Sequence, residues 1–187
     1  DLSMIKDLHQ GFSEQKLYVD VIKRLRNLSL PTVAQVEGLC LGGGIGLALS
    51  CDFVFADRDA IFGTPEVSLG LYPLIISPLI YENCRSRKRA DQFIMTGKRI
   101  SAQEAWEIGL LTEVLDNCEL VGRVSELIQT FKKLDPRVIG FGKKAVRSAL
   151  NEPFDVAVDR LCSSLGELAS SPQTQARIKE FLQRKHE

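Results

Sequence analysis

The hydrophobic positions along the chain follow two different periods. Between residues 13 and 28, apolar side chains recur at spacings of three and four, which predicts an amphipathic helix that ends before Pro31. Shorter, continuous apolar runs follow this helix and predict buried strands. These runs lie at 32–36, 52–56, 60–62 and 112–115.

A glycine-rich turn follows the first of these strands. Gly38 and the consecutive glycines at 42–44 lie between that strand and an apolar segment at 45–50, which predicts a buried helix. A strand, a turn, a helix and a second strand form a βαβ unit. Such a unit implies a parallel sheet.

The rest of the chain is predicted to be mostly helical. The residues Ser-Ala-Gln-Glu at 101–104 form a capping box that opens a helix, and Gly109 suits its C-terminus. Ser171 is a suitable N-cap for the last helix. The pattern therefore predicts an α/β core over residues 1–116 and a helical region over 117–187. The helices expected in that region lie at 118–133, 136–150, 153–166 and 172–185.

The charge balance narrows the classes of function. The 187 residues include 24 Lys and Arg and 24 Asp and Glu, so the formal net charge is zero. A balanced chain lacks the field that favours nucleic acid or an anionic membrane, and we expect neither as a partner. The longest apolar stretch, 69–81, contains two prolines and is too short to span a bilayer. The densest basic run, 85–89, fits either a solvated helix start or a contact with ligand phosphates.

The cysteines and histidines carry further information. The five cysteines are odd in number and widely spaced, with no C-x-x-C motif, which suits reduced thiols in an intracellular compartment. We expect the cytoplasm, and a mitochondrial or peroxisomal location also agrees with this pattern. His9 and His186 are the two histidines, one near each end of the chain. No His/Cys cluster has metal-ligand spacing, so no metal site is expected.

The glycine turn has more than one explanation. A dinucleotide fingerprint fails because Gly42 and Gly44 are followed by Leu47 where the third glycine belongs, and a P-loop fails because no lysine follows. Two explanations remain open from the residues alone. Glycines permit close packing of a strand against a helix, and they also let backbone N–H groups approach an anion or a developing oxyanion.

Two long blocks of sequence resemble the crotonase superfamily, the enoyl-CoA hydratase/isomerase family. The first block runs from residue 31 to 52 through the glycine turn, and the second is Phe-Gly-Thr-Pro-Glu-Val-Ser-Leu-Gly at 62–70. The segments 96–97, 100–105 and 109–111 are similar to the part of the family sequence that follows. The resemblance implies a crotonase-like superhelix of stacked ββα turns with a C-terminal helical region at 117–187 used for trimerisation. It also implies homotrimers or hexamers.

The resemblance implies a substrate and a set of site residues. The substrate is an acyl-CoA thioester, with coenzyme A as part of the substrate and no separate cofactor. Two backbone N–H groups hold the thioester oxygen in an oxyanion hole, and the position of one matches Gly43. Glu66 matches a catalytic carboxylate and is expected to be the general acid/base. Contacts with the substrate are expected at Asp1, Leu2, Leu41, Gly42, Gly43, Pro65 and Leu71.

Glu66 also has an interpretation that does not depend on the family. It follows Pro65, and a glutamate in the first turn of a helix is favoured by the helix dipole. From the residues alone this structural role competes with a catalytic one. The resemblance favours general acid/base chemistry, which requires a positioned carboxylate.

The sequence departs from the family pattern in three places. Hydratases with two glutamates have the second one on the helix after the glycine turn, and the matching residue is Gly46. The segment 72–80 is more similar to hydratases of branched, glutaconyl-type enoyl-CoA esters. The family motif that supplies the second N–H precedes the position of Asp1, so the N-terminal part of the fold is expected to be missing from this sequence. Asp1 is then expected near Gly43, beside an open sheet edge.

Several functions remain after these observations. The first is an enoyl-CoA hydratase/isomerase, and its narrower forms are a monofunctional isomerase and a glutaconyl-type branched-chain hydratase. A non-catalytic acyl-CoA-binding protein on the same fold is an alternative from another class. A related serine protease is disfavoured, because its Ser/His/Asp triad needs a histidine and both histidines lie outside the two blocks.

Overall fold

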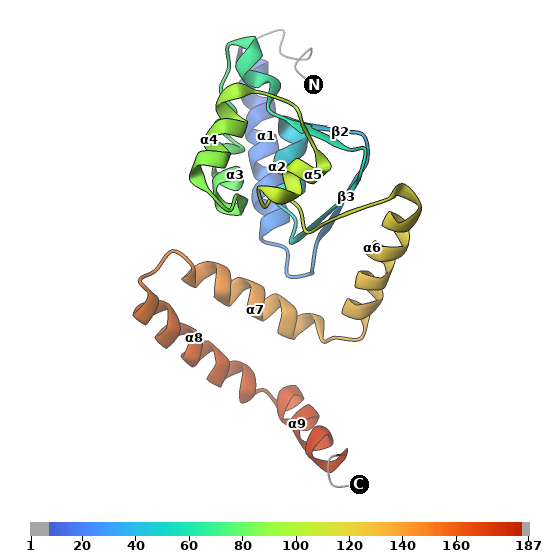
Figure 1. The fold of residues 1–187 in the computed structure, drawn as a ribbon. Helices are drawn as coiled ribbons and strands as arrows, with labels where there is room; N and C mark the ends of the chain where they lie inside the picture. The colour runs from blue at the N-terminus through green and yellow to red at the C-terminus, as the bar shows by residue number, and fades with distance from the viewer. Residues whose placement is uncertain (1–7, 185–187) are drawn as a thin grey trace. The chain divides into compact units, whose positions relative to one another are not determined.

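A computed structural model describes the backbone of residues 8–184 and the side-chain surroundings of residues 15–183 (Figure 1). Contacts within the chain divide it into two compact units. The boundary between them in the sequence falls between Thr130 and Phe131. Asp1 and Leu2, two of the predicted substrate contacts, lie outside the described residues.

The first unit alternates strands and helices. Its elements are α1 (Leu8–Arg26), β1 (Val33–Val36), β2 (Leu39–Leu41), α2 (Gly43–Leu49), β3 (Phe53–Asp57), β4 (Ile61–Gly63), the 3-10 helix η2 (Pro65–Leu69), α3 (Ser77–Asn83), α4 (Arg87–Thr96), β5 (Ile100–Ser101), α5 (Ala102–Glu107), β6 (Glu113–Leu115) and most of α6 (Asn117–Lys132).

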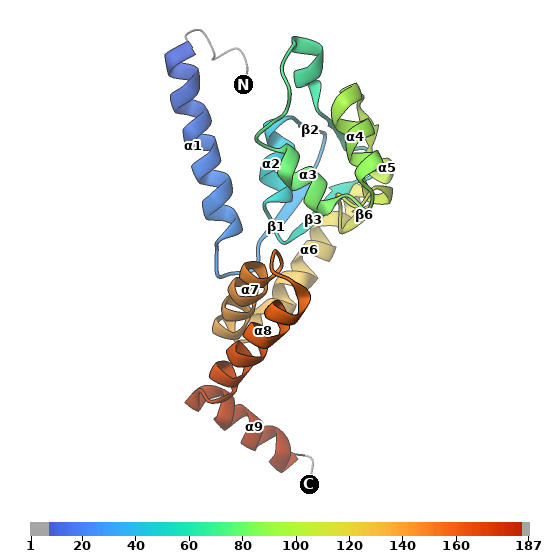
Figure 2. The same ribbon diagram turned by 90° about the vertical axis from the view of Figure 1, so that its left-hand side faces the viewer.

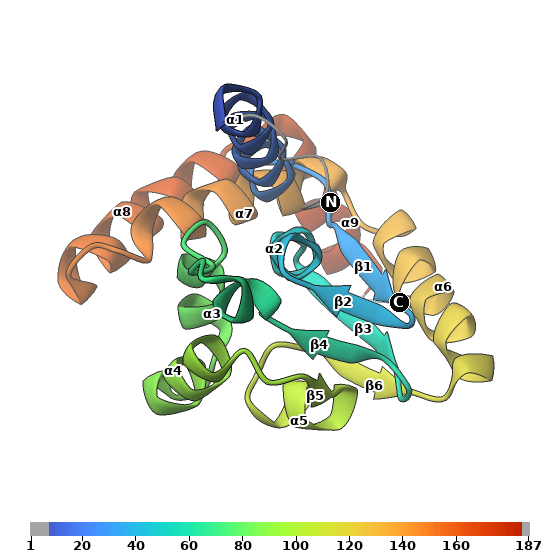
Figure 3. The ribbon, with the colours of Figure 1, turned by 90° about the horizontal axis from the view of Figure 1, so that it is seen from above.

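The described strands form two sheets, and the chain passes from one to the other (Figure 3). One sheet has the order β1-β3-β6 and is parallel throughout. The other has the order β2-β4-β5, with β2 parallel to β4 and β5 antiparallel to it. The first two turns of the chain therefore contribute one strand to each sheet before the next helix, whereas α5 separates β5 from β6. Figure 2 shows α1 on one side of these strands and α4 and α5 on the other.

One apolar core joins the two sheets to their helices. It includes Val54 and Ala56 of β3, Phe62 of β4 and Ile45 of α2. The alternate residue of β3, Phe55, points to the other face of its sheet and packs against α6. A central parallel strand is commonly buried on both faces, as β3 is.

The packing of α6 sets the extent of the first unit. Leu120 and Val124 of α6 are buried against Phe55, so most of this helix belongs with the sheets and the unit continues to Thr130. From the sequence, the division was expected at residue 116, where the pattern of strands ends. That pattern carries no information on the packing of α6 against the sheet.

The second unit contains the helices α7 (Pro136–Ala149), α8 (Phe154–Ala169) and α9 (Pro172–Arg184). Asp135 caps α7 by accepting hydrogen bonds from the Arg137 backbone N–H at 3.0 Å and from the Arg137 guanidinium. These bonds hold the pKa of Asp135 down to about 2. Ser171 accepts from the Thr174 N–H at 3.3 Å, so its predicted role as the N-cap of α9 is confirmed.

The sequence predictions of secondary structure are largely confirmed. The four predicted strands correspond to β1, β3, β4 and β6, and the predicted parallel βαβ unit is the pairing of β1 with β3 across α2. The segment predicted as a glycine-rich turn also contains a short strand, β2, which was not predicted. The basic run at 85–89 is exposed and α4 begins within it, as expected for a solvated helix start.

One detail of the first helix differs from the predicted pattern. Ile22 is buried as expected, but Leu17 is 66% exposed and Val21 is 43% exposed. The half-buried Tyr18 packs against the core instead. Its face of α1 is therefore the one that contacts α2.

Candidate active site

The pairing of β2 with β4 brings the two catalytic candidates together. The strands are parallel, with Leu41 opposite Gly63, so the chain leaves both strands at the same edge of the sheet. Gly42 follows one strand and Glu66 lies three residues beyond the other. The Gly42 N–H donates to the Gly63 carbonyl at 2.9 Å and fixes the two exits side by side.

Gly42 must be glycine for two independent reasons. Its φ of 50° lies in the left-handed region, which other residues rarely adopt. In addition, a methyl group in place of its α-hydrogen would lie 2.7 Å from Oε1 of Glu66. The glycine turn and the Glu66 carboxylate are therefore in direct contact, although 24 positions separate them in the sequence.

The Glu66 carboxylate is held at the start of η2. Its second oxygen, Oε2, is buried and has no hydrogen-bond partner among the described residues. The backbone carbonyl of Glu66 accepts from the Leu71 N–H at 3.0 Å. Thr64, fully buried just before η2, donates its hydroxyl to the Phe93 carbonyl at 3.2 Å and anchors this segment to α4. The backbone on either side of Glu66 is thus anchored, and its buried Oε2 has no hydrogen-bond partner in the described residues.

Gly43 begins α2, directly beside this carboxylate. As the first residue of the helix, it has an N–H for which the helix supplies no acceptor. The next residues close the turn, since the Ile45 N–H donates to the Gly42 carbonyl at 3.0 Å. Gly43 is an exposed residue, and it and Glu66 thus flank the same turn.

The other predicted contacts of the described chain surround this turn. Leu41 is the last residue of β2 and is half-buried, and Pro65 is the half-buried first residue of η2. Leu71 is 52% exposed and is tied to Glu66 by the backbone hydrogen bond described above. Leu41 thus ends β2, Pro65 follows the end of β4, and Leu71 follows η2.

Tyr18 is a site residue that the sequence analysis missed. Its hydroxyl donates to the Gly43 carbonyl at 2.5 Å, from α1 onto α2. Burial, then the charge of Glu66, then Cys40 raise the pKa of Tyr18 to about 12, so the phenol stays protonated at neutral pH. One signal was present: Tyr18 is four residues from Ile22 and seven from Leu25, on one helical face.

Tyr18 also explains the glycine at position 46. A methyl group there would lie 2.1 Å from the Tyr18 hydroxyl oxygen and 2.5 Å from Cγ2 of Ile76. Position 46 matches the family's second carboxylate, and in this chain its side-chain space is filled by other residues.

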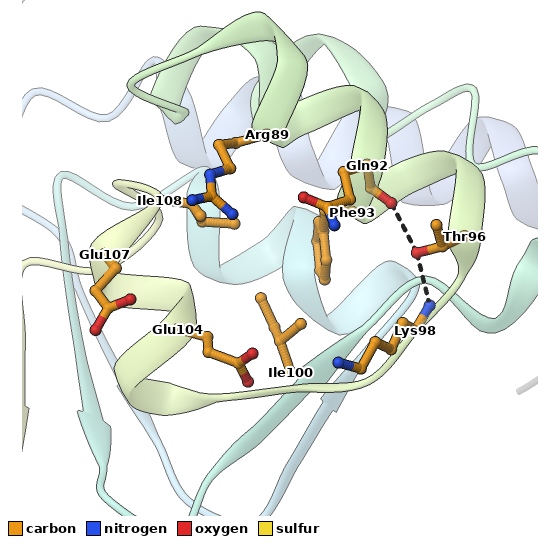
Figure 4. Close-up of a pocket in the computed structure, with 9 residues that line it drawn as sticks. All are labelled: Arg89, Gln92, Phe93, Thr96, Lys98, Ile100, Glu104, Glu107 and Ile108. Carbon is orange, nitrogen blue, oxygen red and sulfur yellow. Dashed lines mark hydrogen bonds between the residues drawn. The ribbon is translucent and has the colours of Figure 1, made fainter.

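A separate cavity of about 210 Å³ lies between α4, β5 and α5 (Figure 4). None of Gly42, Gly43 and Glu66 lines it. Its lining includes two basic residues, Arg89 and Lys98, and two acidic residues, Glu104 and Glu107, so its charges balance and give no preference for an anion. The phosphate contact considered for the run at 85–89 gains no support from this cavity.

Two kinds of feature are absent from the described residues. No helix in the described part of the chain is long and apolar enough to cross a membrane. Within the same residues, no three His, Cys, Asp or Glu side chains are grouped so that they could hold a metal ion.

Comparison with known proteins decides the family. A family profile described as enoyl-CoA hydratase/isomerase matches residues 3–186, nearly the whole chain. The chain belongs to the enoyl-CoA hydratase/isomerase family. This family assignment agrees with the resemblance seen in the blocks at 31–52 and 62–70, and it makes the chain a member of an enzyme family.

Individual members of the family show the extent of the similarity. The short-chain-enoyl-CoA hydratase of Clostridium acetobutylicum is 29% identical over 187 residues, which cover 99% of this chain and 72% of that protein. The crotonyl-CoA hydratase of Syntrophomonas wolfei is 34% identical over 146 residues, 76% of this chain and 54% of that protein. The chain thus matches about half the length of some curated relatives.

A solved structure confirms the fold class. The human enoyl coenzyme A hydratase domain-containing protein 3 superposes with a TM-score of 0.90 at 28% identity, covering 98% of this chain and 74% of that one. The predicted crotonase-like α/β fold, with strand–strand–helix turns followed by a helical region, is therefore confirmed.

Proposed function

We propose that this chain acts on an acyl-CoA thioester as an enoyl-CoA hydratase/isomerase, through an enolate-like intermediate. The observation that carries the proposal is the Glu66 carboxylate, which touches Gly42 and keeps Oε2 buried without a partner in the described residues. A buried acceptor without a partner costs free energy, and such groups are often retained for chemistry. The family and the names of the relatives support the substrate class.

Gly43 has the role of an oxyanion donor in this proposal. Its N–H binds the thioester oxygen, where negative charge accumulates as the enolate forms. A fixed backbone amide suits this task because it needs no reorganisation during the reaction. Leu41, Gly42, Pro65 and Leu71 surround the acyl thioester. Coenzyme A enters as part of the substrate, and the chemistry requires no separate cofactor.

Glu66 has the role of general acid/base. In hydration it takes a proton from water as the water oxygen bonds to the β-carbon, and the proton then goes to the α-carbon. In isomerisation it removes a proton from one carbon and returns it to another. Both reactions balance with one carboxylate that is alternately protonated and ionised.

A monofunctional isomerase is the second candidate, and Gly46 favours it. The space at this position is occupied by Tyr18 and Ile76, so no second carboxylate can extend from it. A single carboxylate is sufficient to move a proton between two carbons. The narrower assignment to a glutaconyl-type branched-chain hydratase rests on the segment 72–80 alone.

We also propose that the chain assembles as a homotrimer or hexamer. Large apolar side chains of the second unit are exposed: Phe154 is 79% exposed, Leu165 is 64% exposed and Phe181 is 61% exposed. An exposed apolar surface of this kind is typical of an assembly interface. A reducing compartment such as the cytoplasm is proposed because none of the five cysteines is in a disulfide.

Ultraviolet absorbance with two substrates tests the proposed function. Hydration of crotonyl-CoA removes the absorbance of its conjugated thioester, whereas isomerisation of 3-hexenoyl-CoA creates that absorbance. The full chain is expected to catalyse at least one of these reactions. Binding of both substrates without turnover would replace the proposal with a non-catalytic acyl-CoA-binding protein.

A further inference from the structure

Tyr18 is a polar group at the candidate site for which no role has been assigned. Its hydroxyl donates to the Gly43 carbonyl at 2.5 Å. A phenol has a single proton, so this bond leaves the Tyr18 oxygen with acceptor capacity only. A group fixed in this way can receive a hydrogen bond but has no second proton to donate.

The position of this oxygen is unusually well defined. It lies 2.1 Å from the point that a β-carbon of residue 46 would occupy, and Ile76 confines the same point from another direction at 2.5 Å. Gly46 is therefore required by the presence of the tyrosine. The phenolic oxygen takes the place where a side chain of α2 would begin.

Glu66 occupies the neighbouring part of the same turn. Its Oε1 lies 2.7 Å from the corresponding point at Gly42, about one helical turn before Gly46. After burial, the negative charge of Glu66 is the next cause of the raised pKa of Tyr18. Glu66 Oε2 is the buried oxygen without a partner in the described residues.

We infer that Tyr18 is a second catalytic residue, which holds the attacking water together with Glu66 during hydration; this inference rests on the proposed function. The water donates one hydrogen to the Glu66 carboxylate and the other to the Tyr18 oxygen. This leaves a lone pair of the water oxygen free to bond to the β-carbon of the enoyl thioester.

The step balances with Glu66 as the only group that changes protonation. The water oxygen bonds to the β-carbon, and the carbon–carbon π electrons move to form the enolate held by the Gly43 N–H. Glu66 takes one water proton and delivers it to the α-carbon. Tyr18 keeps its own proton on the bond to Gly43 and orients the water, so it is not a base.

The test compares two reactions that share Glu66 and Gly43 but differ in their need for water. Hydration of crotonyl-CoA needs an oriented water, whereas exchange of an α-proton of butanoyl-CoA with deuterium oxide needs only the base and the oxyanion donor. Tyr18→Phe removes the hydroxyl and keeps the ring. We expect it to slow hydration about tenfold, the loss of roughly one hydrogen bond, and to change exchange by less than about twofold.

Tyr81→Phe is the matched control. It also removes a tyrosine hydroxyl that donates a hydrogen bond, in that case to Asp91, away from the glycine turn. Both of its rates should equal those of the wild type. If Tyr18→Phe does not fold, Gly46→Ala gives an independent variant, because its methyl group displaces the Tyr18 hydroxyl and should lower hydration selectively.

The possible results separate the inference from the function on which it rests. Equal rates in Tyr18→Phe and the wild type, or a parallel loss of both reactions, would overturn the role of Tyr18 alone. A parallel loss would mean that the tyrosine only shapes the turn. A wild type that neither hydrates nor exchanges would overturn the proposed function, and the role of Tyr18 with it.

Discussion

Gly46 lies where α2 contacts Tyr18 and Ile76, and no further side chain fits between them. In the sequence it is the position of a lost second carboxylate, and restoring a glutamate there would be expected to favour hydration. In the structure its side-chain space belongs to Tyr18 and Ile76. The glycine is therefore part of a packed arrangement, and a glutamate cannot be added without moving both neighbours.

Gly46→Glu is accordingly expected to destabilise the protein and to lower activity. Overpacking alone costs about 1–3 kcal/mol, and burial of a carboxylate adds to that. Thermal unfolding followed by circular dichroism measures the effect. The double variant Tyr18→Ala with Gly46→Glu should recover part of the lost stability. A single variant as stable as the wild type would show that Tyr18 and Ile76 yield easily, contrary to this account.

Gly43 permits a comparison of two substitutions that differ in one N–H group. Proline is tolerated at the first position of a helix, so Gly43→Pro deletes the oxyanion donor at little structural cost. Loss of one such donor typically costs about 2.7–4 kcal/mol of transition-state stabilisation. Gly43→Ala keeps the N–H, and its methyl group would meet Tyr18 at an ordinary 3.4 Å.

We therefore expect kcat to fall roughly 10²–10³-fold in Gly43→Pro and far less in Gly43→Ala. Steady-state kinetics on the substrate that the wild type turns over provides the measurement, after circular dichroism has established folding. Similar kcat values for the two variants would argue against a role for this N–H.

At the scale of elements, the sequence predicted those that have a strong local signal. The βαβ unit and the helices of the second unit follow from hydrophobic period and capping residues. β2 was missed because three residues between glycines are too few to show the alternating hydrophobic pattern of a strand. α3 was not predicted, because two prolines, Pro73 and Pro78, interrupt its apolar stretch. Pro78 nevertheless lies in the first turn of α3, where proline fits.

The candidate site depends on contacts that no local pattern contains. Gly42 and Glu66 meet because β2 and β4 are paired, and Tyr18 reaches Gly43 from 25 residues away. The resemblance to a family supplied the first pair of residues. It did not supply Tyr18, since periodicity predicts a helix but does not say which face of that helix meets which partner.

The capping box at α5 offers a test of element stability. The Ser101 hydroxyl accepts from the Glu104 N–H at 3.2 Å, and the Glu104 carboxylate accepts from the Ser101 N–H at 2.9 Å. Ser101→Ala should lower the free energy of unfolding by about 0.5–2 kcal/mol. Ser86→Ala is the control, because Ser86 is the N-cap of α4 but makes no side-chain capping bond. If chemical denaturation shows that both variants lose the same free energy of unfolding, the capping bond does not contribute the predicted stability.

At the scale of the whole molecule, the exposed apolar side chains of α8 predict assembly. Sedimentation velocity should give the mass of a trimer or a hexamer for the wild type. Phe154→Glu with Leu165→Glu places charges on this surface and should reduce the mass towards that of a monomer. Gln173→Glu adds a charge at an exposed polar position of α9 and should leave the mass unchanged. A monomeric wild type would contradict the proposed assembly.

The most direct test of the whole account is the kcat of Glu66→Gln. The amide has nearly the shape of the carboxylate, so it should fit against Gly42 and preserve affinity for a saturated acyl-CoA, but it cannot take up a proton. Removal of a general acid/base typically costs about 10²–10⁴ in rate, and we predict a loss of kcat in that range. Glu107→Gln, which changes a carboxylate lining the separate cavity, should retain wild-type kcat. A folded Glu66→Gln that keeps more than half of the wild-type kcat would contradict the account.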